Sequence, residues 1–194
     1  LPAQRPSPQR QPRRRLGAWQ HLGPLQRAYR VAGSGIGRGE VGPFRIERSA
    51  HIAAPPQAVF AQVNDFRNWQ HWSPWARLDP AARGTFAGPE QGKGAAFSWA
   101  GNRSVGEGSM TILDSELNDH IRMQLDFRKP MQATNIADFS FAPEGRGTRM
   151  TWAMSGTNSL AGRVMCLAFN PDKMVGGMFE TGMRNIDDLL RAKG

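Results

Sequence analysis

Few side chains in this sequence have the type and placement needed for acid–base chemistry. His71 lies among tryptophans, Glu107 follows a glycine, and Asn135 falls between two alanines two residues away on either side. An enzyme that uses acid–base catalysis needs such a group within hydrogen-bond reach of its substrate, which makes these three the catalytic candidates. The alternation of Gly106, Gly108 and the residues after them predicts that the Glu107 carboxylate faces solvent. The sequence therefore favours a non-catalytic protein, and we assign no catalytic residue.

Metal, thiol and phosphate chemistry have weak support. The histidines at positions 21, 51, 71 and 120 are not spaced as metal ligands, so no metal site is predicted. Cys166 is the single cysteine, which excludes a disulfide within the chain, and we interpret it as a buried structural thiol. The glycines from Gly33 to Gly39 lack the strand, helix and lysine of a phosphate-binding loop. We expect no cofactor.

Asn135 is the best-placed polar group for binding. It falls on the predicted inward face of a strand, between Ala133 and Ala137. A buried amide must find hydrogen-bond partners. A ligand carbonyl is one such partner, and a neighbouring side chain or a water molecule is the alternative.

Three of the six tryptophans lie three residues apart, at Trp69, Trp72 and Trp75. Rings this close need a common apolar wall, and we interpret the stretch as the rim or lid of a cavity. Trp72 is predicted to be largely buried, in contact with the inward strand face and with the final helix near Met178 or Phe179.

The spacing of apolar residues predicts the strands and helices that position these side chains. Alternation predicts strands at 44–52, 85–87, 95–100, 103–113, 120–127, 133–141 and 148–155. Arg48 interrupts the apolar pattern on the inward face of the first predicted strand. A helix is predicted from Pro55 to Val63, followed by a short helix at the tryptophans. Gly101-Asn102 is predicted as a hairpin turn, and the short connections indicate an antiparallel meander.

A long final helix is predicted after Pro171, with Asp172 as its cap. Gly176, Gly177 and Gly182 lie inside it, and each costs about 1 kcal/mol relative to alanine. Gly182 falls on the apolar stripe of this helix. Close packing against the sheet is the favoured explanation for a glycine at this position, and space for a ligand is the alternative.

The inward-facing positions define a predicted cavity lining, rich in aromatic and methionine side chains that adapt to varied apolar shapes. The predicted lining residues are Trp72, Trp75, Trp99, Met123, Asn135, Trp152, Met154, Met178 and Phe179.

The positive charge of the chain is concentrated at the front. Residues 1–43 hold eight arginines against one acidic residue, Glu40, so most of the net charge of +9 lies there. We expect 1–43 to be a disordered basic tail with a Gly-rich linker, and 44–194 to be the folded domain. A nearly neutral domain argues against nucleic-acid binding. Contact of the tail with an anionic membrane through residues 16–30 is the less favoured alternative. No secretory signal is recognised, so a cytoplasmic location is the expectation.

Several short segments together resemble the START/Bet v 1-like (SRPBCC) superfamily, in particular its bacterial polyketide cyclase/dehydrase-like branch. The segments are Ile46–Ser49, Ala54–Pro56, Val59-Phe60, Asn64-Asp65, Trp69, Trp72–Trp75, Gly106–Gly108 with Met110, Thr148–Trp152, Gly156 and Asp172–Gly176. The resemblance covers residues 44–192. It implies an α+β helix-grip fold, in which a curved antiparallel sheet of about seven strands wraps around a long C-terminal helix, with two short helices after the first strand. It also implies an apolar cavity between helix and sheet.

Three functions are compatible with these patterns. The first is binding or carriage of a hydrophobic small molecule or lipid by a monomer, favoured by an apolar lining with few polar groups. The second is a cyclase or dehydratase acting on a polyketide-like or aromatic substrate. The third, implied by chaperone co-activators within the same superfamily, is a module that binds a protein partner.

Overall fold

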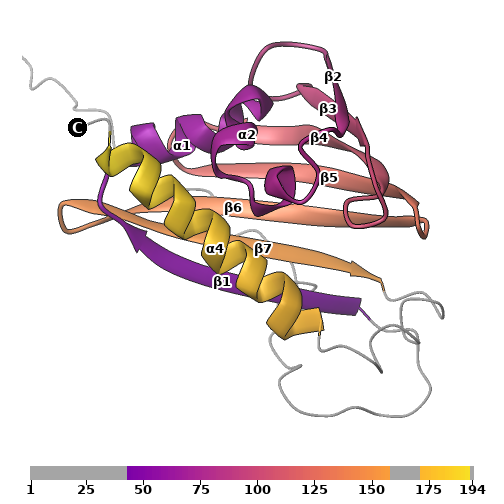
Figure 1. The fold of residues 1–194 in the computed structure, drawn as a ribbon. Coiled ribbons are helices and arrows are strands. Elements are labelled where there is room, and N and C mark those ends of the chain that lie inside the picture. The colour runs from indigo at the N-terminus through magenta and orange to yellow at the C-terminus, as the bar shows by residue number, and fades with distance from the viewer. Residues whose placement is uncertain (1–42, 158–170, 193–194) are drawn as a thin grey trace, which may run out of the picture. The chain divides into compact units, whose positions relative to one another are not determined.

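The computed structural model describes residues 43–157 and 171–192, which form one curved antiparallel sheet with helices on its concave side (Figure 1). The seven strands lie in the order β1-β7-β6-β5-β4-β3-β2. Their bounds are β1 (Pro43–Ile52), β2 (Arg83–Ala87), β3 (Ala96–Ala100), β4 (Glu107–Glu116), β5 (His120–Lys129), β6 (Ala133–Glu144) and β7 (Gly147–Thr157). The predicted α+β helix-grip fold is confirmed.

The helices follow from local sequence signals. They are α1 (Pro56–Asn64), the 3₁₀ turns η4 (Phe66–Asn68) and η5 (Pro74–Arg77), the single-turn α2 (Trp69–Trp72), and α4 (Pro171–Arg191). Pro56 opens α1, where a missing N–H costs nothing. Asp65 Oδ1 accepts a hydrogen bond from Arg67 N at 2.8 Å and so caps η4.

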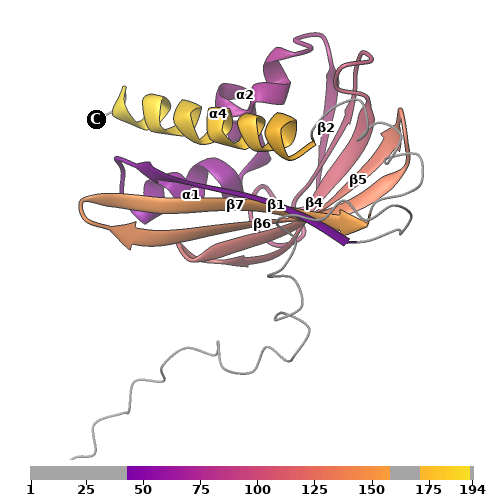
Figure 2. The ribbon, with the colours of Figure 1, turned by 90° about the horizontal axis from the view of Figure 1, so that it is seen from below.

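The strand register sorts the side chains onto two faces. Ile46 pairs with Met154 and Arg48 with Trp152, and the same alternation continues into β6, where Ala137 and Phe139 are buried. Register shifts in β4, at Glu107/Gly108 and at Ile112/Asp114, bend that strand. In Figure 2, β4 and β5 curve toward the side of the sheet that carries α4 and α2. The apolar positions therefore converge on the concave face.

An aromatic cluster joins α4 to this face. The Trp152 and Phe179 rings stack with centroids 4.2 Å apart, and the Trp72 ring meets Trp152 edge-on at 5.9 Å. Trp72 is completely buried, and its Nε1 donates to Gln62 O at 3.0 Å. On α4 it contacts the Gly182 position, and Asn185 Nδ2 donates to its carbonyl oxygen at 2.8 Å. The predicted burial of Trp72 is confirmed, and its contacts with the final helix are at Gly182 and Asn185 rather than at the expected Met178 or Phe179.

Gly182 explains how the helix approaches the cluster so closely. A Cβ at this position would lie 3.0 Å from Trp152 Cζ3 and 3.4 Å from Trp72 Cζ3. This distance is tighter than ordinary van der Waals contact, so any larger side chain would push the helix or a ring away. The expectation that Gly182 serves close packing is supported.

Two local expectations are wrong. The β3–β4 connection is longer than the predicted Gly101-Asn102 turn, because Gly101 N bonds to Gly106 O at 3.0 Å and β4 begins at Glu107. Gly106 has a φ of 65°, which closes this longer loop.

Asp172 is not the cap of the final helix: it lies within the first turn of α4, and its carboxylate binds Arg48.

Some expectations concern residues outside the described ranges. These are the tail and linker through residue 42, and Cys166, which lies between residues 158 and 170. Across the described ranges, no helix combines the length and apolar character that a membrane span requires.

The buried position of Trp72 predicts a large loss of stability in the Trp72→Ala variant. Truncating a fully buried aromatic ring typically costs about 3–5 kcal/mol of unfolding free energy. Trp75→Ala is the control, because Trp75 is only half-buried; we expect about 1–2 kcal/mol there. Equilibrium urea denaturation measures both values. Equal losses in the two variants would contradict the assignment of Trp72 as the central core ring.

Candidate functional site

The predicted lining residues separate into a packed group and an open group. Trp72, Met123, Trp152 and Phe179 are each at most 4% exposed. All four belong to the hydrophobic core, where Trp152 and Phe179 stack and Trp72 meets Trp152 edge-on. In this packed group, Trp152 and Phe179 join β7 to α4, and Met123 lies on β5, where it pairs with Ala137.

The open group consists of the predicted lining residues that are only half-buried. Trp75, Trp99, Met154 and Met178 are half-buried, and they come from η5, β3, β7 and α4. Trp75 links the two groups, because its ring lies 5.8 Å from Trp152 and 6.4 Å from Phe179. Side chains from four elements therefore present apolar surface that the core does not fully cover.

Trp99 forms the far wall of this open group. Its ring lies parallel to that of Phe97 at 6.4 Å and meets Phe127 edge-on at 5.9 Å. Gly108 lies directly beneath, since a Cβ there would overlap the indole ring. Trp99 Nε1 donates to Val105 O at 3.0 Å, which fixes the ring. The ring is thus held flat against the sheet.

Sequence reasoning did not include Leu125 or Phe127 in the lining. Both lie on the inward face of β5, where Leu125 pairs with Asn135 and Phe127 with Gly108. Their position in the alternation of β5 was the available signal. A surface hollow of about 420 Å³ begins beside Phe127, at the end of the β5–β6 hairpin. It is lined by Asp126, Phe127, Arg128, Gln132, Ala133 and Thr134.

Asn135 is the polar member of the predicted lining. It pairs with Leu125 on one side and Gly156 on the other, and it is 8% exposed. Its Nδ2 donates to Met154 Sδ at 3.9 Å. A thioether is a weak acceptor, so this amide is held less firmly than an amide bonded to oxygen.

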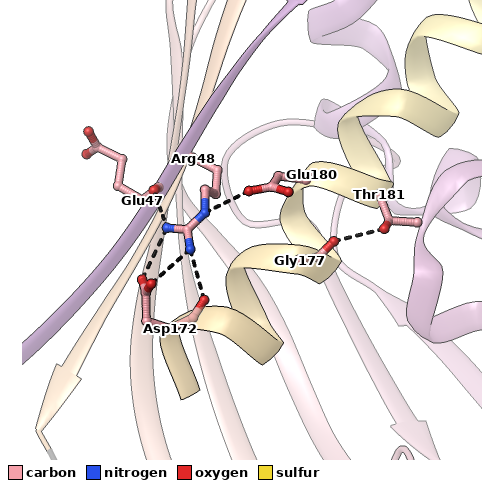
Figure 3. Close-up of polar contacts among 6 residues, drawn as sticks. All are labelled: Glu47, Arg48, Asp172, Gly177, Glu180 and Thr181. Carbon is pink, nitrogen blue, oxygen red and sulfur yellow. Dashed lines mark hydrogen bonds and ion pairs between the residues drawn. The ribbon is translucent and has the colours of Figure 1, made fainter. Parts of the chain in front are cut away.

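Arg48 forms the charged part of the concave face. Figure 3 shows its guanidinium between β1 and the first turns of α4. Nη2 donates to Asp172 Oδ2 at 2.9 Å, and Nε donates to Glu180 Oε1 at 2.9 Å. Nη1 donates to Asp172 Oδ1 at 3.1 Å and to Glu47 O at 2.9 Å, while Nη2 also reaches Asp172 O at 3.0 Å. These five bonds match the five N–H groups of the side chain.

Arg48, the charged residue on the inward face of β1, therefore connects the sheet to α4 through its hydrogen bonds. Its side chain is 25% exposed, and it lies over Gly176, where a Cβ would overlap the guanidinium. The hydrogen bond from Arg48 lowers the pKa of the Asp172 carboxyl below its ordinary value, and the same bond raises the pKa of Arg48. Charge-assisted bidentate bonds of this kind are stronger than neutral ones.

Two of the three catalytic candidates lie away from the concave face. The Glu107 carboxylate pairs with Lys129 Nζ at 2.7 Å, and the His71 side chain is exposed next to Gln70. Asn135 is inward, but an amide does not exchange protons as a general acid or base. These three residues therefore do not assemble an acid–base pair.

A cluster that sequence reasoning missed surrounds His120, at the end of β5 opposite to Phe127. His120 Nε2 lies 3.2 Å from Asp114 Oδ2, and Nδ1 lies 3.4 Å from Glu116 Oε2 and 3.5 Å from Asp119 Oδ2. The β4–β5 turn brings the four side chains together. Their spacing in sequence gave no such signal.

Comparisons with known proteins agree with this architecture. The sequence pattern of one family, described as polyketide cyclase/dehydrase and lipid transport, matches residues 43–191. No curated protein matches the chain. Protein CV1439 from Chromobacterium violaceum has a similar structure, with a TM-score of 0.55 and 14% identity, over 75% of this chain and 95% of its own.

Two other solved structures share the fold. Protein Ms6760 from Mycobacterium smegmatis has a TM-score of 0.55 and 18% identity, over 77% of this chain and 92% of its own. Ara h 8.0201 has a TM-score of 0.51 and 12% identity, over 75% of this chain and 98% of its own. At these identities the similarity establishes the fold.

The contact between Gly176 and Arg48 predicts opposite behaviour for two adjacent glycines. Gly177→Ala should stabilise the protein by about 0.5–1 kcal/mol, because no atom lies within 4 Å of its Cβ position and alanine favours helix. Gly176→Ala gains the same helix propensity but displaces the guanidinium, so we expect no net gain or a loss. Urea denaturation compares the pair. An equal gain in both variants would show that the position of Arg48 does not depend on Gly176.

The lowered pKa of Asp172 predicts a contribution to stability that depends on pH. A carboxyl whose pKa is lower in the folded state stabilises the protein above its unfolded pKa of about 3.9, and this contribution is lost as pH falls through the folded pKa. Asp172→Asn should therefore be less stable than the wild type at pH 6, by on the order of 1 kcal/mol or less. The difference should shrink below about pH 4. Denaturation series at pH 3 and pH 6 test this, and a difference independent of pH would contradict it.

Proposed function

The chain belongs to the polyketide cyclase/dehydrase and lipid transport family of the START/Bet v 1-like (SRPBCC) superfamily, and from this premise we propose that it binds and carries a hydrophobic small molecule. The open group of Trp75, Trp99, Met154 and Met178, with Asn135, is the proposed binding surface. Family membership and the fold support hydrophobic ligand binding in general; the place of binding on this chain is our proposal.

One observation carries the proposal. Half-buried Trp75, Trp99 and Met154, from η5, β3 and β7, pack against the core cluster without being fully covered by it, and Met178 of α4 is half-buried as well. Burying apolar surface contributes roughly 25 cal/mol per Å², so a guest that covers these side chains gains affinity without new polar contacts. The two methionines add adaptability to guests of different shape.

Binding is favoured over catalysis by the positions of the catalytic candidates. Glu107 and His71 lie outside the concave face, and Asn135 supplies a hydrogen bond but not a proton at neutral pH. A cyclase or dehydratase acting on this surface would need an acid or base that these three residues do not provide. The partner-binding function is an expectation from the resemblance, and no specific contact favours it.

Four further expectations stay predictions from the sequence. They are the basic tail at residues 1–43, the cytoplasmic location, the monomeric state and the lack of nucleic-acid binding.

Nile red, an uncharged dye that fluoresces in apolar surroundings, tests the proposed surface. The full chain should bind it, and Met178→Glu should weaken binding at least tenfold, because the new carboxylate would lose hydration when a guest covers it. Met174→Glu is the matched control on the same helix: Met174 is 60% exposed, so we expect less than a twofold change.

Native mass spectrometry of the purified protein provides an independent measurement, since a carried lipid would appear as added mass that organic extraction removes. Absence of Nile red binding by the wild type would contradict the proposed function. Equal losses in the two variants would move the binding surface away from Met178.

A further inference from the structure

We propose that the guest is an uncharged molecule with a hydrogen-bond-accepting carbonyl, such as a ketone or an ester, and that Asn135 Nδ2 donates to that carbonyl. Guests with a carboxylate at the same position are disfavoured. This inference rests on the proposed function, because it names the ligand class of the same concave surface.

The first argument is the incomplete hydrogen bonding of Asn135. Asn135 is 8% exposed, and its Nδ2 donates to Met154 Sδ at 3.9 Å. Buried amides normally bond to oxygen or nitrogen, and a donor left with a weak acceptor forgoes part of that stabilisation. Met154 is flexible and half-buried, so its thioether can give way to a carbonyl oxygen.

The surroundings determine which end of the amide meets the guest. A Cβ at Gly156 would overlap Asn135 Oδ1, so this oxygen occupies the space above the glycine, beside the Phe44 ring. Only the nitrogen can donate to sulfur, which directs Nδ2 toward Met154. A guest that takes the place of the Met154 sulfur therefore meets the NH₂ end of the amide. Because this end donates, the group of the guest that binds there must be a hydrogen-bond acceptor.

The second argument is that the inward-facing cation is already satisfied. Each of the five N–H groups of Arg48 has an acceptor, and two of the partners are the carboxylates of Asp172 and Glu180. One cation between two anions leaves this cluster negative. A guest carboxylate would have to displace an existing partner or be repelled by it.

Two further cations lie at the end of β5, on the strand that carries Phe127. Lys129 is exposed and pairs with Glu107 at 2.7 Å, and Arg128 is exposed and donates to Gly108 O at 3.1 Å. Exposed charges compensate a buried anion poorly. A carboxylate beside Asn135 would therefore lose its hydration without a counter-charge, whereas a neutral carbonyl would gain a hydrogen bond.

Three small probes of nearly equal shape test the inference by displacement of Nile red at pH 7.5. They are 2-acetylnaphthalene with a ketone, 2-naphthoate with a carboxylate, and 2-ethylnaphthalene with no polar group. We expect the ketone to bind about three- to tenfold more tightly than the ethyl compound, the range of one net hydrogen bond. We expect 2-naphthoate to bind at least tenfold more weakly than the ketone.

Variants of the full chain assign the preference to one side chain. Asn135→Leu should abolish the advantage of the ketone over the ethyl compound while the ethyl compound still binds. Asn135→Ala removes the amide without adding bulk, so it should also abolish that advantage. Ser140→Ala, at an exposed position of the same strand, is the control and should retain it. Unfolding curves verify that each variant is folded, and the Asn135→Ala variant decides the outcome if the Asn135→Leu variant does not fold.

The outcomes distinguish the inference from the function on which it rests. If 2-naphthoate binds as tightly as the ketone, or if Asn135→Ala retains the ketone preference, the inference is overturned while hydrophobic binding stands. If none of the three probes displaces Nile red and the dye itself does not bind, the proposed function fails and the inference fails with it.

Discussion

The stacking of Trp152 on Phe179 is the contact on which the rest of the structure depends. Their rings are 4.2 Å apart and nearly parallel, at 12°, which brings α4 against β7. Gly182 allows this approach, because a side chain there would meet Trp152 and Trp72. With the helix held at this place, the side chains beneath it are buried, and those of the open group extend beyond the cluster. The proposed binding surface is thus a consequence of where the aromatic cluster ends.

Polar groups on the concave face are few, and two of them, Arg48 and Asn135, differ in how completely they are hydrogen-bonded. Arg48 is surrounded by carboxylate and carbonyl acceptors, and it ties β1 to the N-terminal turns of α4. Asn135 has a sulfur acceptor for its amide nitrogen and lies in an apolar row between Leu125 and Gly156. A satisfied charge stabilises the packing, whereas a weakly bonded donor remains suited to a ligand. This contrast explains why the function proposed here is binding of a neutral guest.

Much of the fold was predictable because burial sets the periodicity of each element. The alternation in β5 to β7 and the apolar stripe of α4 predicted the strands, their inward faces and the final helix, and the close spacing of three tryptophans predicted the burial of Trp72. Arg48 was recognised as inward but remained unexplained, because its partners Asp172 and Glu180 lie more than 120 residues away in sequence. The β3–β4 loop was predicted too short, since Asp79 Oδ2 accepts from Asn102 N and supports a longer turn. Which lining residues are packed and which are open depends on where α4 lies, and local periodicity does not encode that position.

Methionine methyl NMR is the most direct measurement of the central claim that a hydrophobic guest occupies the open part of the concave face. Met154 and Met178 lie in the open group, whereas Met150 and Met183 are fully buried in the core. On titration with 2-acetylnaphthalene, we predict large shifts in the ¹³C-methyl signals of Met154 and Met178, with Met150 and Met183 nearly unchanged. Shifts confined to the core methyls, or an unchanged spectrum at saturating probe, would contradict this account.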